Sequence, residues 1–150
     1  MPVDPYTMKN LFYVLGGGIA LWLLTRVSLG KRLLFNFSGI KPKGKLLNPI
    51  LEITISAQNP TNQRATINSI TGTLFLDGKE ISNISSFKQQ IILPNAETFL
   101  TIDAKPGIIG IINVLKDIFS REKSKTYRFR FAGSANVDNI VVPIDNEIVL

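Results

Sequence analysis

The segment Leu11–Leu24, LFYVLGGGIALWLL, is the only long uncharged apolar run in the sequence. It lies between Lys9 and Arg26, and it is slightly shorter than the about 20 apolar residues that a membrane-spanning helix needs. The helix reaches that length if Arg26 extends its side chain to the headgroups and the apolar segment continues beyond it. The sequence therefore predicts a transmembrane helix over residues 11–30, after an N-terminal tail over residues 1–10.

Two other interpretations of this run stay open. A cleaved signal peptide fits less well, because only Lys9 precedes the run and no A-x-A-like cleavage site follows it. A buried core helix is typical of shorter runs of about 10–14 residues. In a membrane, Trp22 would favour the headgroup level, and Gly16 and Ala20 would form a small-xxx-small pair for helix–helix packing.

The positive charge is concentrated beside this run. Residues 1–45 contain seven Lys or Arg and one Asp, whereas residues 46–150 contain ten basic and ten acidic side chains, so the net charge of +6 belongs to the first part. Each Lys or Arg near an anionic membrane surface contributes about 1 kcal/mol of attraction. We therefore expect a bilayer with anionic headgroups as a partner. The predicted interface residues are Lys9, Trp22, Arg26, Lys31, Arg32, Lys41, Lys43 and Lys45.

The same charges predict an orientation. Lysines and arginines within about 20 residues of a spanning helix tend to stay on the cytoplasmic side. Six of them follow the run and one precedes it. The C-terminal domain is therefore expected on the cytoplasmic face or a topologically equivalent one, such as the outer face of an internal virion membrane. Translocation to the periplasm or the exterior is the alternative.

Composition removes several kinds of chemistry. The chain has no cysteine and no histidine, which excludes a disulfide framework, a thiolate nucleophile, a Cys/His zinc site and a histidine base. Its eleven acidic residues are scattered. We expect no enzyme, catalytic residue, metal site or cofactor. The basic cluster Arg121–Arg130 is interpreted as a helix end and the wet face of a strand, so no nucleic acid is expected either.

Apolar residues at alternate positions recur along the rest of the chain, which predicts β-strands. Turn residues such as Asp77-Gly78 and Asp138-Asn139 separate these stretches. Pro106–Phe119 instead has apolar residues spaced by three and four, which predicts one amphipathic helix. Gly39–Pro49 is interpreted as a basic loop. The predicted strands are 33–38, 50–57, 65–76, 79–84, 87–93, 97–104, 127–131, and 140–144 with 148–150.

Short strands separated by turns indicate a mainly β protein, an antiparallel β-sandwich. The predicted domain covers residues 31–150. Residues 31–49 hold its first strand and the basic juxtamembrane loop, and residues 50–150 form its main body.

Four motifs in this order resemble the late-embryogenesis-abundant type 2 family, also called the WHy domain. The resemblance covers about residues 33–150 and implies an immunoglobulin-like or fibronectin-like sandwich with one helix. It also implies a non-enzymatic protein, since members are non-enzymatic and many are membrane-anchored. The motifs are Asn59-Pro60, the hairpin Ile70–Gly78, Leu93-Pro94 with Glu97–Ile102, and Phe129–Val137 with Val142-Pro143.

These observations together predict a single-pass, membrane-anchored structural or interaction protein with protein partners, including a homo-oligomer or a capsid-type assembly. One alternative is a minor capsid-associated membrane protein of a virus with an internal lipid membrane. Another is a sandwich that binds a lipid or another ligand between its sheets.

Overall fold

The computed structural model describes residues 32–45, 48–107, 114–117 and 126–150. The predicted spanning helix over residues 11–30 lies outside these ranges, and so do Lys9, Gly16, Ala20, Trp22, Arg26 and Lys31. Within the described ranges, no helix has the length and apolar character required to cross a membrane.

Within the described part of the chain, eight antiparallel strands form two sheets. The three-stranded sheet has the order β1-β2-β6, and the five-stranded sheet has the order β4-β3-β7-β8, with β5 paired to β3. The strands are β1 (Leu34–Lys45), β2 (Asn48–Asn59), β3 (Ala65–Leu76), β4 (Lys79–Ser86), β5 (Gln90–Ile92), β6 (Ala96–Ala104), β7 (Arg128–Val137) and β8 (Ile140–Val149).

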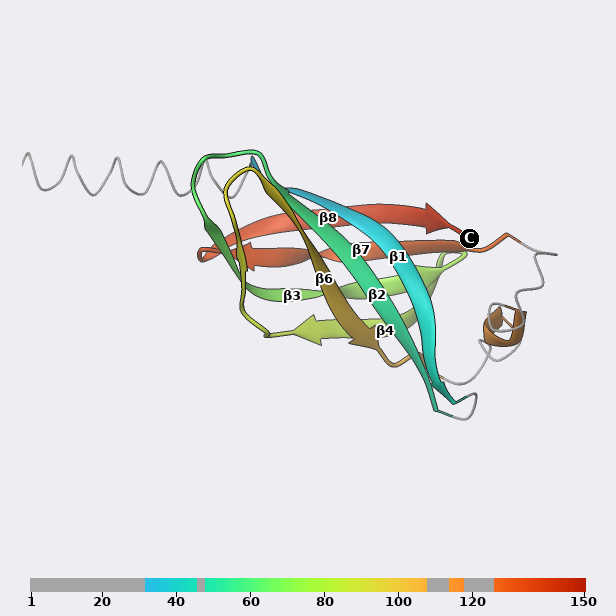
Figure 1. Ribbon diagram of the computed structural model, residues 1–150. Coiled ribbons are helices and arrows are strands. Elements are labelled where there is room, and N and C mark those ends of the chain that lie inside the picture. The colour runs from blue at the N-terminus through green and yellow to red at the C-terminus, as the bar shows by residue number, and fades with distance from the viewer. Residues whose placement is uncertain (1–31, 46–47, 108–113, 118–125) are drawn as a thin grey trace, which may run out of the picture.

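The two sheets pack face to face as a β-sandwich, and their strands cross at a wide angle (Figure 1). The alternation read from the sequence places Leu51, Ile53 and Ile55 of β2 inside, where all three are buried. Phe129 and Phe131 of β7 are buried from the opposite sheet in the same core cluster. Burial of these alternating apolar positions is what holds the two layers together.

Two predicted hairpin turns are confirmed. Asp77 and Gly78 have φ values of 47° and 80°, and Asp138 and Asn139 have φ values of 48° and 68°. Positive φ at both central residues is the geometry that two-residue hairpins require. Pro143, expected at an edge or bulge, lies on the edge strand β8, where its missing N–H breaks no ladder.

The predicted loop over residues 39–49 is wrong. β1 continues to Lys45 and pairs with β2 through Pro42↔Leu51 and Lys45↔Asn48. Proline and glycine misled the prediction because β1 is an edge strand, where a residue without an N–H is tolerated. The strand predicted over residues 87–93 is too long, since only Gln90–Ile92 pairs with β3.

The helix predicted over Pro106–Phe119 is confirmed only in part. Residues 114–117 are helical, residues 106 and 107 are not, and residues 108–113 and 118–119 lie outside the described ranges. Leu115 of this helix is buried in the core cluster. The predicted apolar face is therefore correct at the position that can be compared.

Candidate interaction site

The two ends of the sandwich differ in the side chains that they carry. We call the proximal end the one at which β1 begins, together with the β2–β3 loop and the β5–β6 and β7–β8 turns (Figure 1). The distal end holds the β1–β2 connection, the β3–β4 turn and the ends of β6 and β8. The chain passes from the predicted anchor into the sandwich at the proximal end, because β1 starts at Leu34.

A buried asparagine builds the proximal end. Asn59, which is 1% exposed, closes β2, and its Nδ2 donates to the carbonyl oxygens of Gln63, Leu93 and Ile92 at 2.7, 3.2 and 3.5 Å. Its Oδ1 accepts from the backbone N and the Oγ1 of Thr61, at 3.1 and 2.7 Å. One satisfied amide therefore fixes the β2–β3 loop against the β5–β6 turn.

A shallow concavity of about 380 Å³ opens at this end. Its lining comes from the end of β2 and the start of β6, and includes Gln58, Pro60, Asn95 and Glu97. Gln58 Nε2 of β2 donates to Glu97 Oε1 of the neighbouring strand β6 at 3.4 Å. The concavity lies at the surface and not between the sheets, so it does not favour the alternative of a ligand held inside the sandwich.

Large apolar side chains are exposed around the proximal end. Leu34 at the start of β1 is 54% exposed, Ile91 of β5 54%, Leu93 in the β5–β6 turn 61% and Val141 at the start of β8 68%. Phe99, further along β6, is also exposed. We call the first four the proximal ring. They lie on the outer side of both sheets, beyond the buried neighbours Leu33, Ile92 and Val142.

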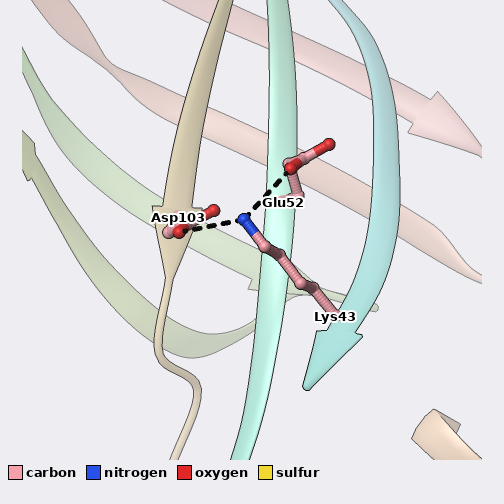
Figure 2. A network of polar contacts seen from close by, with 3 residues as sticks. All are labelled: Lys43, Glu52 and Asp103. Carbon is pink, nitrogen blue, oxygen red and sulfur yellow. Dashed lines mark hydrogen bonds and ion pairs between the residues drawn. The ribbon is translucent and has the colours of Figure 1, made fainter.

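Charged side chains gather toward the distal end. The ion pairs of Lys43 with Glu52 and Asp103, of Arg128 with Glu147 and of Arg130 with Asp145 lie in that half of the sandwich. On the three-stranded sheet, Lys43 of β1 reaches between Glu52 of β2 and Asp103 of β6, at 3.5 and 3.6 Å (Figure 2). All three side chains are solvated, so these pairs contribute at most about 1 kcal/mol.

The five-stranded sheet carries a second charged group. Arg130 donates to both carboxylate oxygens of Asp145, at 2.7 and 2.5 Å, and its guanidinium lies 5.8 Å from the ring centre of Phe75. The hydrogen bond to Asp145 is the main cause that raises the pKa of Arg130, and the reciprocal bond lowers the pKa of Asp145. Arg128 pairs with Glu147 at 3.8 Å.

Tyr127 connects the helix at residues 114–117 to the distal end. Its hydroxyl donates to Asp117 at 2.5 Å, and its backbone N–H and carbonyl both bond with Leu150. The hydrogen bond from the hydroxyl to Asp117, followed by burial and the charges of Asp117 and Asp77, raises the pKa of Tyr127 to about 12. The tyrosine therefore stays neutral and donating well above neutral pH.

The structure separates the predicted headgroup contacts that it describes. Arg32 lies at the proximal end, whereas Lys41, Lys43 and Lys45 follow along β1 toward the distal end. Eleven residues of strand at about 3.3 Å each place Lys45 roughly 35 Å from Leu34. These three lysines therefore lie away from the end at which β1 begins, and Lys43 contacts two carboxylates.

Sequence reasoning missed the residues that form the proximal end. The sequence marks Asn59 only through the Asn59-Pro60 motif, and nothing in that motif indicates that the side chain is buried with both amide atoms hydrogen-bonded. Leu34 and Phe99 carry a usable signal, because each is an apolar residue in the polar register of an alternating strand. Such positions point outward and indicate an exposed apolar surface.

Neither a protein-family model nor a curated protein sequence matches the chain. Solved structures do. The solution structure of At1g01470 from Arabidopsis thaliana matches with a TM-score of 0.57 and 15% identity, covering 77% of this chain and 79% of that one. A solution structure assigned to a late embryogenesis abundant (LEA) protein, At2g46140.1, matches with a TM-score of 0.52 and 15% identity, covering 97% and 84%.

These similarities concern the fold. They confirm that the chain forms an LEA-like β-sandwich, as the motif order predicted. The Asn59-Pro60 motif on which the resemblance rests is the pair that closes β2 and fixes the proximal loops.

Proposed function

We propose that this protein is a non-enzymatic interaction or structural module, held at a membrane by a single N-terminal helix over residues 11–30. The C-terminal sandwich would lie on the cytoplasmic or an equivalent face, as the lysines and arginines after the apolar run favour. The rule acts on the chain as it inserts, so the later folding of Lys41, Lys43 and Lys45 into a strand does not weaken it.

The observation that carries the proposal is that two sheets, both formed by residues within 34–149, supply a shared core among the described residues. Both sheets bury their inner faces against each other, and the cluster contains residues from β1 to β8. A core assembled in this way does not require the uncharged run Leu11–Leu24 as a packing partner. An apolar run of this length then needs another apolar environment, and a bilayer supplies one.

The non-enzymatic part of the proposal rests on how the carboxylates are arranged. Glu52, Asp103, Asp145 and Glu147 lie on solvated outer faces of the sheets and pair with Lys or Arg. Among the residues with described positions, no group of acidic side chains could hold a metal ion. A paired, solvated carboxylate is a poor general acid or base at neutral pH.

Alkaline carbonate extraction of membranes from cells that express the full chain tests the anchor. We expect the chain to stay in the membrane pellet. Arginine at both Leu15 and Leu21 should release it, because each arginine near the centre of a spanning helix costs about 2.5–3.5 kcal/mol. Alanine at the same two positions is the matched control and should leave the chain in the pellet. Recovery of the unaltered chain in the soluble fraction would contradict the proposal.

A further inference from the structure

The four residues of the proximal ring place exposed apolar side chains around one end of the sandwich. Leu34 extends the outer face of the three-stranded sheet, and Ile91 and Val141 extend that of the five-stranded sheet. Leu93 lies between them, in the turn that Asn59 fixes. All four are more than half exposed. Because the four side chains of the ring lie around this whole end, a single partner can contact all of them only if the partner's surface is broad and flat.

The register places each ring residue of a strand near the proximal edge of its own sheet. Leu34 pairs with Gln58, one residue before β2 ends, and Ile91 pairs with Thr66, one residue after β3 begins. Val141 pairs with Asn136, one residue before β7 ends. Each ring residue of a strand is therefore within about one residue of the proximal limit of its sheet.

The connection to the predicted anchor is short. Leu34 lies five positions after Leu29, which ends the apolar segment, so four residues lie between them. Fully extended, five positions span at most about 18 Å. An anchor over residues 11–30 would therefore hold the proximal end, and not the distal end, against the bilayer surface.

Charge is consistent with this orientation. Arg32 and Arg64 are exposed at the proximal end, where they can reach headgroup phosphates. The described acidic residues there are Glu97, which bonds Gln58, and Asp138 in the β7–β8 turn. The carboxylates in ion pairs lie in the distal half. Apolar side chains beside basic ones and away from most carboxylates are typical of interfacial contact.

We propose that the proximal ring, Leu34, Ile91, Leu93 and Val141, sits in the headgroup region of the bilayer and holds the sandwich upright on it. This inference rests on the proposed anchor and adds a second membrane contact, made by the folded domain itself. Its ligand is the lipid interface, and not a pocket-bound molecule. The distal end, with its paired charges, then faces away from the membrane.

The natural absence of cysteine permits a direct test. Single cysteines replace Val141 or Leu93 in the full-length chain, which is labelled with the fluorophore NBD and reconstituted into phosphatidylcholine–phosphatidylglycerol vesicles. The matched control is Val149→Cys, since Val149 is also an exposed valine of β8, 54% exposed, at the opposite end. All three positions are exposed, so labelling leaves the core intact.

We expect NBD at residues 141 and 93 to emit at shorter wavelength than at residue 149. Lipids with a nitroxide near the headgroup should quench it at least about twofold more strongly than at residue 149. Equal, water-like emission at all three positions would overturn the inference. Apolar emission without lipid quenching would also overturn it, because the ring would then contact protein, either a second copy or the apolar run of the same chain.

Flotation of the same labelled vesicles separates this inference from the proposed anchor. A chain that floats with the vesicles but shows water-like emission at residues 93 and 141 keeps its anchor and lacks the ring contact. A chain that does not float lacks the anchor, and both proposals fail.

Discussion

The proximal and distal ends of the sandwich are stabilised by different chemistry. At the proximal end a buried amide, Asn59, makes its hydrogen bonds out of water, and exposed apolar side chains surround it. At the distal end, carboxylates and basic side chains pair in solvent, as Lys43 and Arg130 do. A polar contact contributes far more to the free energy of unfolding where water cannot replace the lost partner. Substitutions at the two ends should therefore differ greatly in cost.

The largest effect is expected for Asn59→Asp. The new carboxylate would face three carbonyl oxygens that Nδ2 now satisfies, and it would be buried without a positive partner. We expect a loss of about 3–5 kcal/mol in the free energy of unfolding at pH 7. Urea denaturation measures it. Asn62→Asp, at an exposed position three residues along the same loop, is the control and should cost less than about 0.5 kcal/mol.

The pH dependence of Asn59→Asp separates charge from shape. Burial would raise the pKa of Asp at this site in the folded state above its unfolded value of about 3.9. The penalty is then absent below that value and grows as the pH rises above it, since only the unfolded chain ionises freely. Stability relative to the parent chain should therefore recover on acidification toward pH 4. A deficit that is the same at pH 4 and pH 7 would contradict the electrostatic explanation.

A somewhat smaller loss is expected midway between the ends, for Gly133→Ala. A Cβ at Gly133 would lie 2.2 Å from the carbonyl oxygen of Thr71 and 2.6 Å from Cα of Gly72, so strands β3 and β7 would have to separate. We expect about 1–3 kcal/mol of destabilisation in thermal or urea unfolding. Gly39→Ala is the matched strand control, with its nearest atom at 4.0 Å. Equal effects at the two glycines would refute the packing argument.

At the distal end, the raised pKa of Tyr127 predicts a loss of stability at alkaline pH. Its folded pKa of about 12 exceeds the unfolded value of 10.0, so its contribution is complete below pH 10 and is lost as the pH rises toward 12. Tyr127→Phe should flatten the fall of the melting temperature between pH 10 and pH 12 while leaving its shape below pH 9 unchanged. Parallel curves for the two proteins across the alkaline range would contradict the assignment.

The smallest effect is expected for Lys43→Met. This change removes both ion pairs of the distal group but keeps the length of the side chain. Because these charges are solvated, we expect less than about 1 kcal/mol, and a smaller difference still in 1 M salt. Lys45→Met, at the end of the same strand, is the control. A loss of several kcal/mol for Lys43→Met would show that the two ends do not differ as proposed.

Most of the sandwich follows from local rules. Alternation in Ile50–Ala57 and the turn residues Asp77-Gly78 each specify one structure by themselves, because a half-buried strand needs period two and a tight hairpin needs positive φ. The loop predicted over Gly39–Pro49 is wrong because an edge strand tolerates proline. Whether a strand lies at an edge depends on the whole sheet and cannot be read from a local pattern.

The candidate site was harder to predict. The exposed ring could be suspected from Leu34 in a polar register, but its meeting with Leu93 and Val141 depends on the strand order of both sheets. The basic residues show that closeness in sequence differs from closeness in the fold. Lys41, Lys43 and Lys45 lie close to the apolar run in sequence, yet an extended strand carries them to the far end of the molecule.

Residues 31–150 are expected to fold as an independent domain, and residues 1–30 are expected to provide its anchor in a membrane. Separate expression of the 31–150 fragment and the full chain, followed by membrane fractionation and circular dichroism of the fragment, tests this central claim most directly. We expect a soluble fragment with a β spectrum and a cooperative unfolding transition, and a full chain in the membrane fraction. An unfolded or aggregated fragment, or one that stays in the membrane as completely as the full chain, would contradict it.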